Sequence, residues 1–189
     1  MNTAEITKKK DIYLELDQEL ALRILTEEDI TLNYINWLNY PQVMELTEQN
    51  NKTHDLSSVQ NFVKGCFLNH GIYLFGIFYN KTHIGNIKLG PINHDHGTAD
   101  VSYVIGEQDF WGKGIATLAI EAVTSFGFKS LGLYKIKAGT YENNFGSIKA
   151  LQKCGFQQEG LFIEEIYFGG NRINSLRFGL IKPMNKKND

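Results

Sequence analysis

Two glycines with one residue between them, Gly112 and Gly114, stand where the sequence changes from a strand-like segment, residues 99–106, to a helical pattern. In that pattern, apolar residues recur at intervals of three and four from Ile115 to Phe126, as on the buried face of a helix. The start of a helix carries unpaired N–H groups and the positive end of the dipole, and glycines let a phosphate group approach the main chain. The two glycines therefore indicate either a tight turn alone or a phosphate-binding turn.

A second polar pair, Asn144 and Ser147, stands at the beginning of a short helical pattern at residues 145–153. This spacing is typical of a helix N-cap, in which the first side chain accepts a hydrogen bond from an N–H group of the first turn. The two cysteines, Cys66 and Cys154, have neither CxxC nor Cys/His ligand spacing. They argue against a structural zinc ion, and we expect no metal site.

The composition is that of an ordinary globular protein. Of the 189 residues, 42% are hydrophobic and 21% are charged, and the formal net charge is −2, so we expect no nucleic-acid partner. Basic residues cluster only at 8–10 and at 186–187, where we expect solvated tails. We find no signal-peptide pattern and no segment of membrane-spanning length. Together with the cysteine usage, these features predict a cytoplasmic protein without a membrane partner.

The order of the predicted elements indicates one α/β domain at residues 18–185, preceded by an N-terminal extension at residues 1–17. Short turns join strands at 72–79, 83–89 and 98–105, so these strands should run antiparallel. The long helix after 98–105 implies a crossover to a parallel neighbour at 134–140, which gives a mixed sheet with helices on its faces. We also expect strands at 20–25 and within 157–181, an edge strand near 12–16, helices from Thr26 to Tyr40, from Ser57 to Phe67 and at 145–153, a polar mobile segment at 43–54, and a loop at 90–97.

Three motifs in order, ADVSYVIG (99–106), WGKGIATLAIEAV (111–123) and NNFGSIKALQKCGF (143–156), resemble the GNAT acyl-CoA N-acetyltransferases. The resemblance covers roughly residues 20–180 and is closest to the RimJ/RimL-like branch, which contains acetyltransferases of ribosomal-protein N-termini, of spermidine and of amino sugars. It implies an α/β (α+β) fold with a mixed, mostly antiparallel sheet that is splayed and flanked by helices.

The resemblance also implies acetyl-CoA as cosubstrate and assigns residues to it. The N–H groups at the helix N-terminus bind the pyrophosphate, with Lys113 as a charge partner. The amide-bearing pantetheine arm pairs with the main chain of the strand at its splayed end. One departure is Asp109, which stands where the family usually has Gln or Arg, so phosphate binding must depend on main-chain amides. The expected cofactor-binding residues are Tyr103, Val104, Ile105, Trp111, Gly112, Lys113, Gly114, Ile115, Ala116, Thr117, Asn144 and Ser147.

Catalysis needs a proton donor for the departing thiolate and a base for the attacking ammonium. Many family members carry a tyrosine four residues after Ser147, but this chain has Leu151, so the resemblance makes Ser147 the candidate donor. It makes Asp100 and Glu165, with its neighbour Glu164, candidates for the base. Each of these carboxylates can equally be a solvated surface group.

The implied function is acetyl transfer from acetyl-CoA to a primary amine by direct attack, on a protein N-terminus or on a small molecule. Two alternatives stay open: acetylation of an amino sugar, such as a nucleotide sugar of surface-polysaccharide biosynthesis, and binding of acetyl-CoA without turnover. For a polyamine, Glu45 and Glu48 are a weak indication. We expect a monomer or a homodimer. We place the acceptor on the opposite side of the sheet, where the aromatic candidates are Trp37, Tyr40, His54, Tyr73, Phe75 and Tyr167.

Overall fold

The computed structural model describes residues 8–50 and 52–183 and contains one mixed sheet in the order β1-β2-β3-β4-β5-β6-β8-β7. All neighbouring strands are antiparallel except β5 and β6, which are parallel. This arrangement confirms the predicted mixed sheet and its crossover. The strands are β1 (Tyr13–Glu15), β2 (Leu20–Ile24), β3 (Tyr73–Tyr79), β4 (Thr82–Asn93), β5 (Thr98–Ile105), β6 (Lys135–Tyr141), β7 (Gln157–Phe168) and β8 (Asn171–Ile181).

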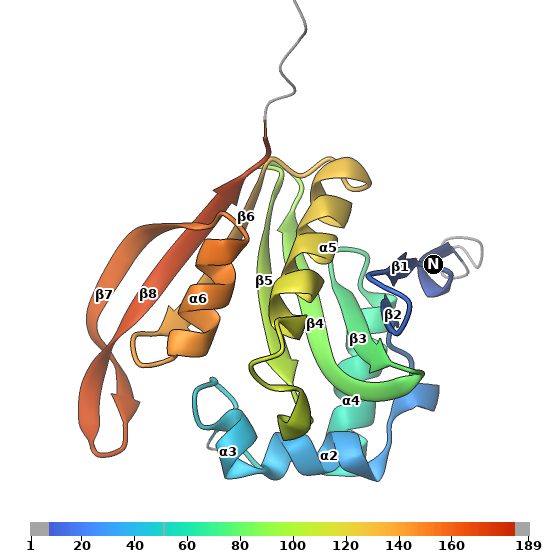
Figure 1. Ribbon diagram of the computed structural model, residues 1–189, viewed down its shortest axis with the longest axis horizontal. Coiled ribbons are helices and arrows are strands. Elements are labelled where there is room, and N and C mark those ends of the chain that lie inside the picture. The colour runs from blue at the N-terminus through green and yellow to red at the C-terminus, as the bar shows by residue number, and fades with distance from the viewer. Residues whose placement is uncertain (1–7, 51, 184–189) are drawn as a thin grey trace, which may run out of the picture.

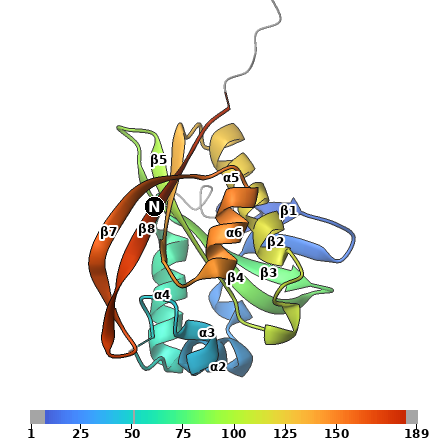
Figure 2. The ribbon, with the colours of Figure 1, turned by 60° about the vertical axis from the view of Figure 1, so that its left-hand side comes forward.

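Helices cover both faces of the sheet, and each face has its own core. Helices α5 (Ile115–Lys129) and α6 (Phe145–Lys153) lie side by side over one face (Figures 1 and 2), where Ile120, Val123 and Leu151 are buried. Helices α2 (Leu32–Asn39), α3 (Pro41–Met44) and α4 (Leu56–Leu68) cover the other face with a second buried cluster. The sheet therefore has a side that carries α5 and α6 and a side that carries α4.

Strands β5 and β6 pair over only three rungs. The pairs are Thr98 with Lys135, Ala99 with Ile136 and Asp100 with Lys137. Beyond Asp100, β5 continues along β4, while β6 continues along β8 as far as Tyr141. The two strands separate there (Figure 1), which confirms the splay that the family resemblance implied.

The segment from Thr26 to Tyr40 is not the single helix that we predicted. A 3-10 turn, η1 (Glu27–Asp29), comes first, and α2 begins only after a new N-cap at Thr31. The Asp29 carboxylate accepts hydrogen bonds from the main-chain N–H of Thr26, at 2.9 Å, and from Arg23 Nη1, at 2.8 Å. These bonds hold the 3-10 turn against β2, and α2 begins only after this turn has ended.

Two predicted loops are also more regular than we expected. Helix α3 occupies the start of the segment predicted to be mobile, and its Val43 and Met44 are buried. Strand β4 extends to Asn93, through most of the first half of the predicted 90–97 loop, because its pairing shifts after Leu89 and resumes between Ile92 and Ala99. Helix α4 begins at Leu56 with Asp55 as N-cap, slightly before the predicted start.

The N-terminal extension is integrated into the fold as far as the structure describes it. Strand β1 pairs with β2, as predicted. Lys9, however, is not in a solvated tail: only 8% of it is exposed. Its Nζ donates to the carbonyl oxygens of Cys66, at 2.8 Å, Asn69, at 2.8 Å, and Ile72, at 2.6 Å. An ammonium group suits this position because the last carbonyls of a helix lack intrahelical partners and carry the negative end of the dipole. Lys186 and Lys187 lie outside the described residues.

Candidate active site

The turn before α5 presents a row of unused main-chain donors. Gly112 and Gly114 have φ values of 72° and 82°, in the left-handed region that glycine adopts without strain. Gly114 is the N-cap of α5, and no side chain caps that helix. Within the described part of the chain, the main-chain N–H groups from Gly112 to Thr117 donate no hydrogen bond to other protein groups. Free N–H groups at the start of a helix are suited to an anion, and a Cβ atom built on either glycine meets no atom within 4 Å.

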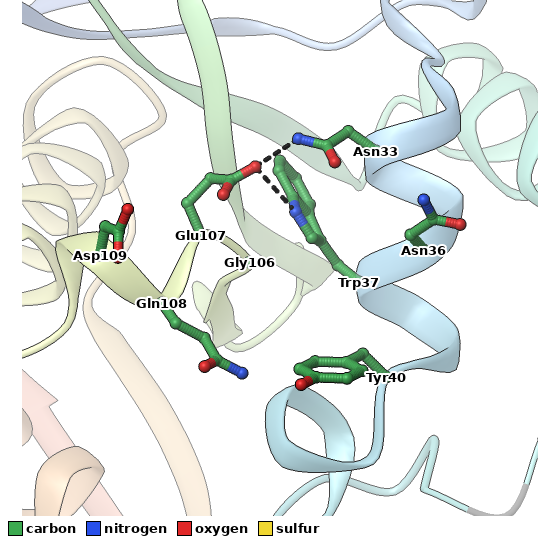
Figure 3. Close-up of a pocket in the computed structure, with 8 residues that line it drawn as sticks. All are labelled: Asn33, Asn36, Trp37, Tyr40, Gly106, Glu107, Gln108 and Asp109. Atoms are coloured by element: carbon green, nitrogen blue, oxygen red, sulfur yellow. Dashed lines mark hydrogen bonds between the residues drawn. The ribbon is translucent and has the colours of Figure 1, made fainter.

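Helix α2 fixes the position of this turn. The ring of Trp37 lies against Gly106, and a Cβ atom at Gly106 would collide with it. The carboxylate of Glu107 accepts hydrogen bonds from Trp37 Nε1, at 3.2 Å, and from the side-chain amide of Asn33 (Figure 3). Beside these contacts lies a small open pocket of about 270 Å³. Trp111 adds a second tie, because its indole N–H donates to the Ile105 carbonyl oxygen at 2.8 Å.

The strand that enters the turn leaves main-chain groups free along the gap between β5 and β6. The N–H of Gly106 donates to the Ile84 carbonyl on β4, at 2.9 Å. Because hydrogen-bonding direction alternates along an antiparallel strand, Val104 also points its N–H and C=O toward β4, whereas Tyr103 and Ile105 point theirs toward the gap. Tyr103 and Ile105 are therefore the residues that can pair with an extended, amide-bearing ligand, with the Ile105 carbonyl oxygen already accepting the Trp111 indole N–H. Val104 lies between them, and its side chain faces the α4 side.

A cleft of about 820 Å³ reaches both faces of the sheet. From the side of α5 and α6, it is lined by Asn144, Ser147 and Leu151. From the side of α4, it is lined by Val59 and Phe62. A cleft with both sets of residues passes through the sheet where β5 and β6 part. Residues from Asp100 to Val104 on β5 and from Ala138 to Tyr141 on β6 line this passage.

Two hydroxyl groups, one from the first turn of α6 and one from β5, lie at the cleft. Asn144 is the N-cap, and its Oδ1 accepts a hydrogen bond from the Ser147 main-chain N–H at 3.0 Å. The Ser147 hydroxyl itself makes no hydrogen bond within the described residues, so it is available to a ligand. The Tyr103 hydroxyl lies close by and donates to the Ser147 carbonyl oxygen at 3.4 Å. Burial raises the pKa of Tyr103 to about 12, so it is protonated at neutral pH. Leu151 is buried and carries no proton to give.

The predicted carboxylates are not gathered in one place. Asp100 lines the cleft at the last rung before the strands part, and Lys137 Nζ lies 3.3 Å from its carboxylate. Glu165, on β7, does not line the cleft; its carboxylate pairs with Arg177 Nη2, at 3.3 Å, and Arg177 lines the cleft instead. Glu164 sits at a bulge of β7 with a φ of 52°. Of the three, Asp100 alone faces the passage.

A further carboxylate, Glu48, comes to the cleft from the loop between α3 and α4. Burial, followed by the negative charge of Glu48, raises the pKa of Tyr141 to about 12. The Glu48 carboxylate therefore lies near the Tyr141 hydroxyl on β6. We noted Glu48 in the sequence as an acidic residue, but nothing in its local pattern indicates its contact with Tyr141, 93 positions away.

The family model described as "Acetyltransferase (GNAT) domain" matches residues 19–157. The chain belongs to the GNAT acetyltransferase family. The chain is similar over nearly its whole length to the uncharacterized N-acetyltransferase p20 of Bacillus licheniformis, with 29% identity over 182 residues, which are 95% of this chain and 94% of that protein. About half of the chain is similar to the spermidine N(1)-acetyltransferase of Escherichia coli (strain K12), with 33% identity over 93 residues, 49% of this chain and 50% of that protein.

Solved structures of GNAT proteins share the architecture. RimL, a ribosomal L7/L12 alpha-N-protein acetyltransferase in complex with coenzyme A, superimposes with a TM-score of 0.81. The match covers 90% of this chain and 97% of RimL at 16% sequence identity, so the likeness concerns the fold. In this chain, that fold comprises the eight-stranded sheet in which β5 parts from β6.

The aromatic residues expected at the acceptor side of this GNAT domain lie mostly elsewhere. His54 lines the cleft, whereas Trp37 and Tyr40 line the smaller pocket of Figure 3. Tyr73 and Phe75 face α5 instead, with ring centres 5.3 Å and 5.7 Å from that of Phe126. Tyr167 is 68% exposed, on β7. On the α4 side of β4 and β5, four polar residues line the cleft, Asn86, Lys88, Asp100 and Ser102, and the apolar Leu74 and Val104 lie beside them.

In the part of the chain that the structure describes, no group of three or more His, Cys, Asp or Glu side chains is placed to hold a metal ion. None of the helices described has the length and apolar character that crossing a membrane requires.

Proposed function

We propose that this GNAT protein transfers the acetyl group of acetyl-CoA to a primary amine by direct attack. The observation that carries the proposal is the parting of β5 and β6 at Asp100, over a cleft that joins the two faces of the sheet. Such a passage lets a thioester on one side meet an amine on the other. The free N–H groups from Gly112 to Thr117 follow directly at the end of the parted strand, as a pyrophosphate requires.

The residues divide between cofactor and chemistry in this proposal. Main-chain amides from Gly112 to Thr117 and the Lys113 ammonium bind the pyrophosphate. The main chain of Tyr103 and Ile105, with Val104 between them, pairs with the amides of the pantetheine arm, and Asn144 and Trp111 complete its surroundings. When bound, acetyl-CoA supplies an activated acyl group, and the thiolate of coenzyme A is an adequate leaving group. The Ser147 hydroxyl is the candidate that holds a proton near the sulfur.

Asp100 is our candidate for the base that accepts the proton of the ammonium, directly or through water. Its position at the last paired rung supports this assignment, because the amine must reach the gap there. Glu165 is a weaker candidate, since Arg177 already holds its carboxylate outside the cleft lining.

We place the acceptor among the amines of the RimJ/RimL-like branch, either a protein N-terminus or a small molecule. An amino sugar is the alternative acceptor, and binding of acetyl-CoA without turnover is the alternative function. We further propose a cytoplasmic protein that has no nucleic-acid or membrane partner, is a monomer or a homodimer, and whose acetyltransferase domain extends from residue 18 to residue 185.

Thiol release from acetyl-CoA, measured with a panel of amino sugars, nucleotide sugars, polyamines and N-terminal peptides, tests the proposal. Turnover with at least one amine supports an enzyme, and mass spectrometry of the product identifies the acetylated nitrogen. Tight acetyl-CoA binding by calorimetry without turnover of any amine supports the binding protein instead. Absence of both contradicts the proposal.

A further inference from the structure

Lys88 lies at the middle of the sheet on the side that carries α4. It stands opposite Leu74 on β3 and Ser102 on β5, and all three residues line the cleft. Its side chain is partly buried between the sheet and α4. The positive charge of Lys88 partly offsets the rise in pKa that burial gives to the Cys66 thiol on α4, so the ammonium lies close to that helix.

Most of the other charged groups around the passage have partners, and Lys52, which lines the cleft without an ion pair among the described residues, is exposed to solvent. Asp100 pairs with Lys137, and Glu165 pairs with Arg177, each at 3.3 Å. Glu48 lies near the Tyr141 hydroxyl, whose pKa its negative charge helps to raise. Lys88, in contrast, forms neither an ion pair nor a hydrogen bond with any other described residue. A partly buried cation without a partner is costly, and an anion that enters the cleft relieves that cost.

We propose that Lys88 binds an anionic group of the acceptor, a carboxylate or a phosphate. This inference rests on the proposed function and narrows its substrate class to primary amines that also carry an anion. Lys88 and Asp100 lie on the same side of neighbouring strands, and residues on such a diagonal are about 7–8 Å apart. A small molecule can therefore place its amine at Asp100 and its anion at Lys88.

The same charges disfavour a polyamine. A polyamine selects a strongly acidic pocket, whereas the lining of this cleft contains three cationic side chains, Lys52, Lys88 and Arg177, and two carboxylates, Glu48 and Asp100. The second ammonium of a polyamine would meet Lys88, which has no carboxylate within ion-pair distance in the described chain.

Matched pairs of amines test this inference in the thiol-release assay. The pairs are glucosamine 6-phosphate with glucosamine, 2-aminoethyl phosphate with ethanolamine, and β-alanine with β-alaninamide, and spermidine serves as the polycation. The phosphate and carboxylate arms distinguish the two sources of the anion. The variants are Lys88→Met, Lys88→Arg and Lys88→Glu, and Lys64→Met is the matched control. Lys64 is an exposed lysine of α4 that pairs at 3.9 Å with Glu27, away from the cleft lining.

For wild type, we expect kcat/KM to favour the anionic member of at least one pair by about 10- to 100-fold, the value of a charge-assisted hydrogen bond. Lys88→Met should remove that preference, Lys88→Arg should keep most of it, and Lys88→Glu should shift the preference toward ethanolamine or spermidine. The KM for acetyl-CoA should stay within about threefold in all variants, and Lys64→Met should match wild type.

Two results overturn the inference: a wild-type preference for neutral or polycationic amines, and an anionic preference that survives in Lys88→Met. Failure of the proposed function looks different, since no amine is then acetylated. In that case, the anion site is tested by calorimetric binding of glucosamine 6-phosphate and 2-aminoethyl phosphate in the presence of coenzyme A. Binding that weakens at least tenfold in Lys88→Met supports the anion site, and absent or unchanged binding contradicts it.

Discussion

Alanine at Gly114 and alanine at Gly132 make a matched pair that separates backbone strain from loss of the cofactor. Both glycines have positive φ, 82° and 69°, and a Cβ atom at either meets no atom within 4 Å. The left-handed conformation costs an alanine about 1–2 kcal/mol relative to glycine. For a chain of this size, that cost lowers the melting temperature by roughly 2–8 °C. The two variants should therefore lose similar stability.

The two variants should differ in cofactor affinity. Gly114 is the N-cap of α5, within the row of free N–H groups, whereas Gly132 follows the other end of that helix. Added bulk at Gly114 keeps the pyrophosphate away from the amides and weakens at least one hydrogen bond to a charged group, which contributes about 1.5–3 kcal/mol. The Kd for acetyl-CoA should then rise roughly 10- to 150-fold in Gly114→Ala. It should stay unchanged in Gly132→Ala.

Isothermal titration calorimetry with acetyl-CoA gives the Kd values, and thermal melts of the same preparations give the loss of stability that the backbone strain causes. Equal affinities in the two variants, with equal melting temperatures, would refute the phosphate turn and leave Gly112 and Gly114 as a tight turn alone. A fall in the affinity of Gly132→Ala as large as that of Gly114→Ala would also count against the site, because it would trace the loss to general destabilisation.

Three more outcomes are expected. Ser147→Ala should lower the rate of thiol release roughly 10- to 1,000-fold. Its melting temperature should change little, because the helix cap depends on Asn144 and on a main-chain N–H, whereas Asn144→Ala should cost about 1 kcal/mol of stability. Unchanged turnover in Ser147→Ala would contradict the role of the Ser147 hydroxyl as proton donor. Lys9→Met should lower the free energy of unfolding by about 2–4 kcal/mol in urea titrations, whereas exposed Lys10→Met should change it by less than about 1 kcal/mol. Burial lowers the pKa of His83 below its usual 6.5, so the unfolded chain binds the proton more readily than the folded one. The free energy of unfolding should therefore fall as the pH drops below 6.5. Urea titrations at pH 7.5 and 5.5 should show a smaller fall in His83→Gln than in wild type.

The geometry of the turn before α5, the proposed cofactor site, could be predicted from the sequence because it depends on the main chain. Two glycines before an amphipathic helix are sufficient to indicate left-handed residues and free N–H groups, and both are present at Gly112 and Gly114. The crossover from β5 to β6 follows from the length of α5 alone. The three-rung pairing that ends at Asp100 agrees with the splay implied by the family resemblance.

The acceptor side could not be predicted in the same way, because apolar residues occupy both faces of the central strands. Tyr73, Leu74 and Phe75 are all apolar or aromatic, so their alternation gives no polar face from which to orient β3. The structure turns Tyr73 and Phe75 toward α5 and Leu74 toward the cleft. Lys88 is the one charged residue of the β4 core segment, and its orientation follows only once this register is known.

Lys9 and Glu48 illustrate a different limit. Both form contacts with residues more than 50 positions away, Lys9 with the end of α4 and Glu48 with Tyr141. A lysine in a basic cluster near a terminus usually indicates a solvated tail. Here, the unpaired carbonyls at the end of α4 outweigh that tendency, since they offer the ammonium several acceptors within 3.0 Å.

The division between main-chain and side-chain recognition bears on how such a site can change its substrate. The groups proposed for acetyl-CoA are mostly amides, and they survive the replacement of almost any side chain at Tyr103, Ile105 or Thr117. The groups proposed to face the acceptor are the side chains of Lys88, Asp100 and Ser102, which line the cleft on the other side of the sheet. A single substitution there alters the charge of the cleft without moving the segment after β5, where Gly106 and Glu107 contact Trp37 of α2. Lys88→Glu should therefore change which amines react while leaving acetyl-CoA binding intact.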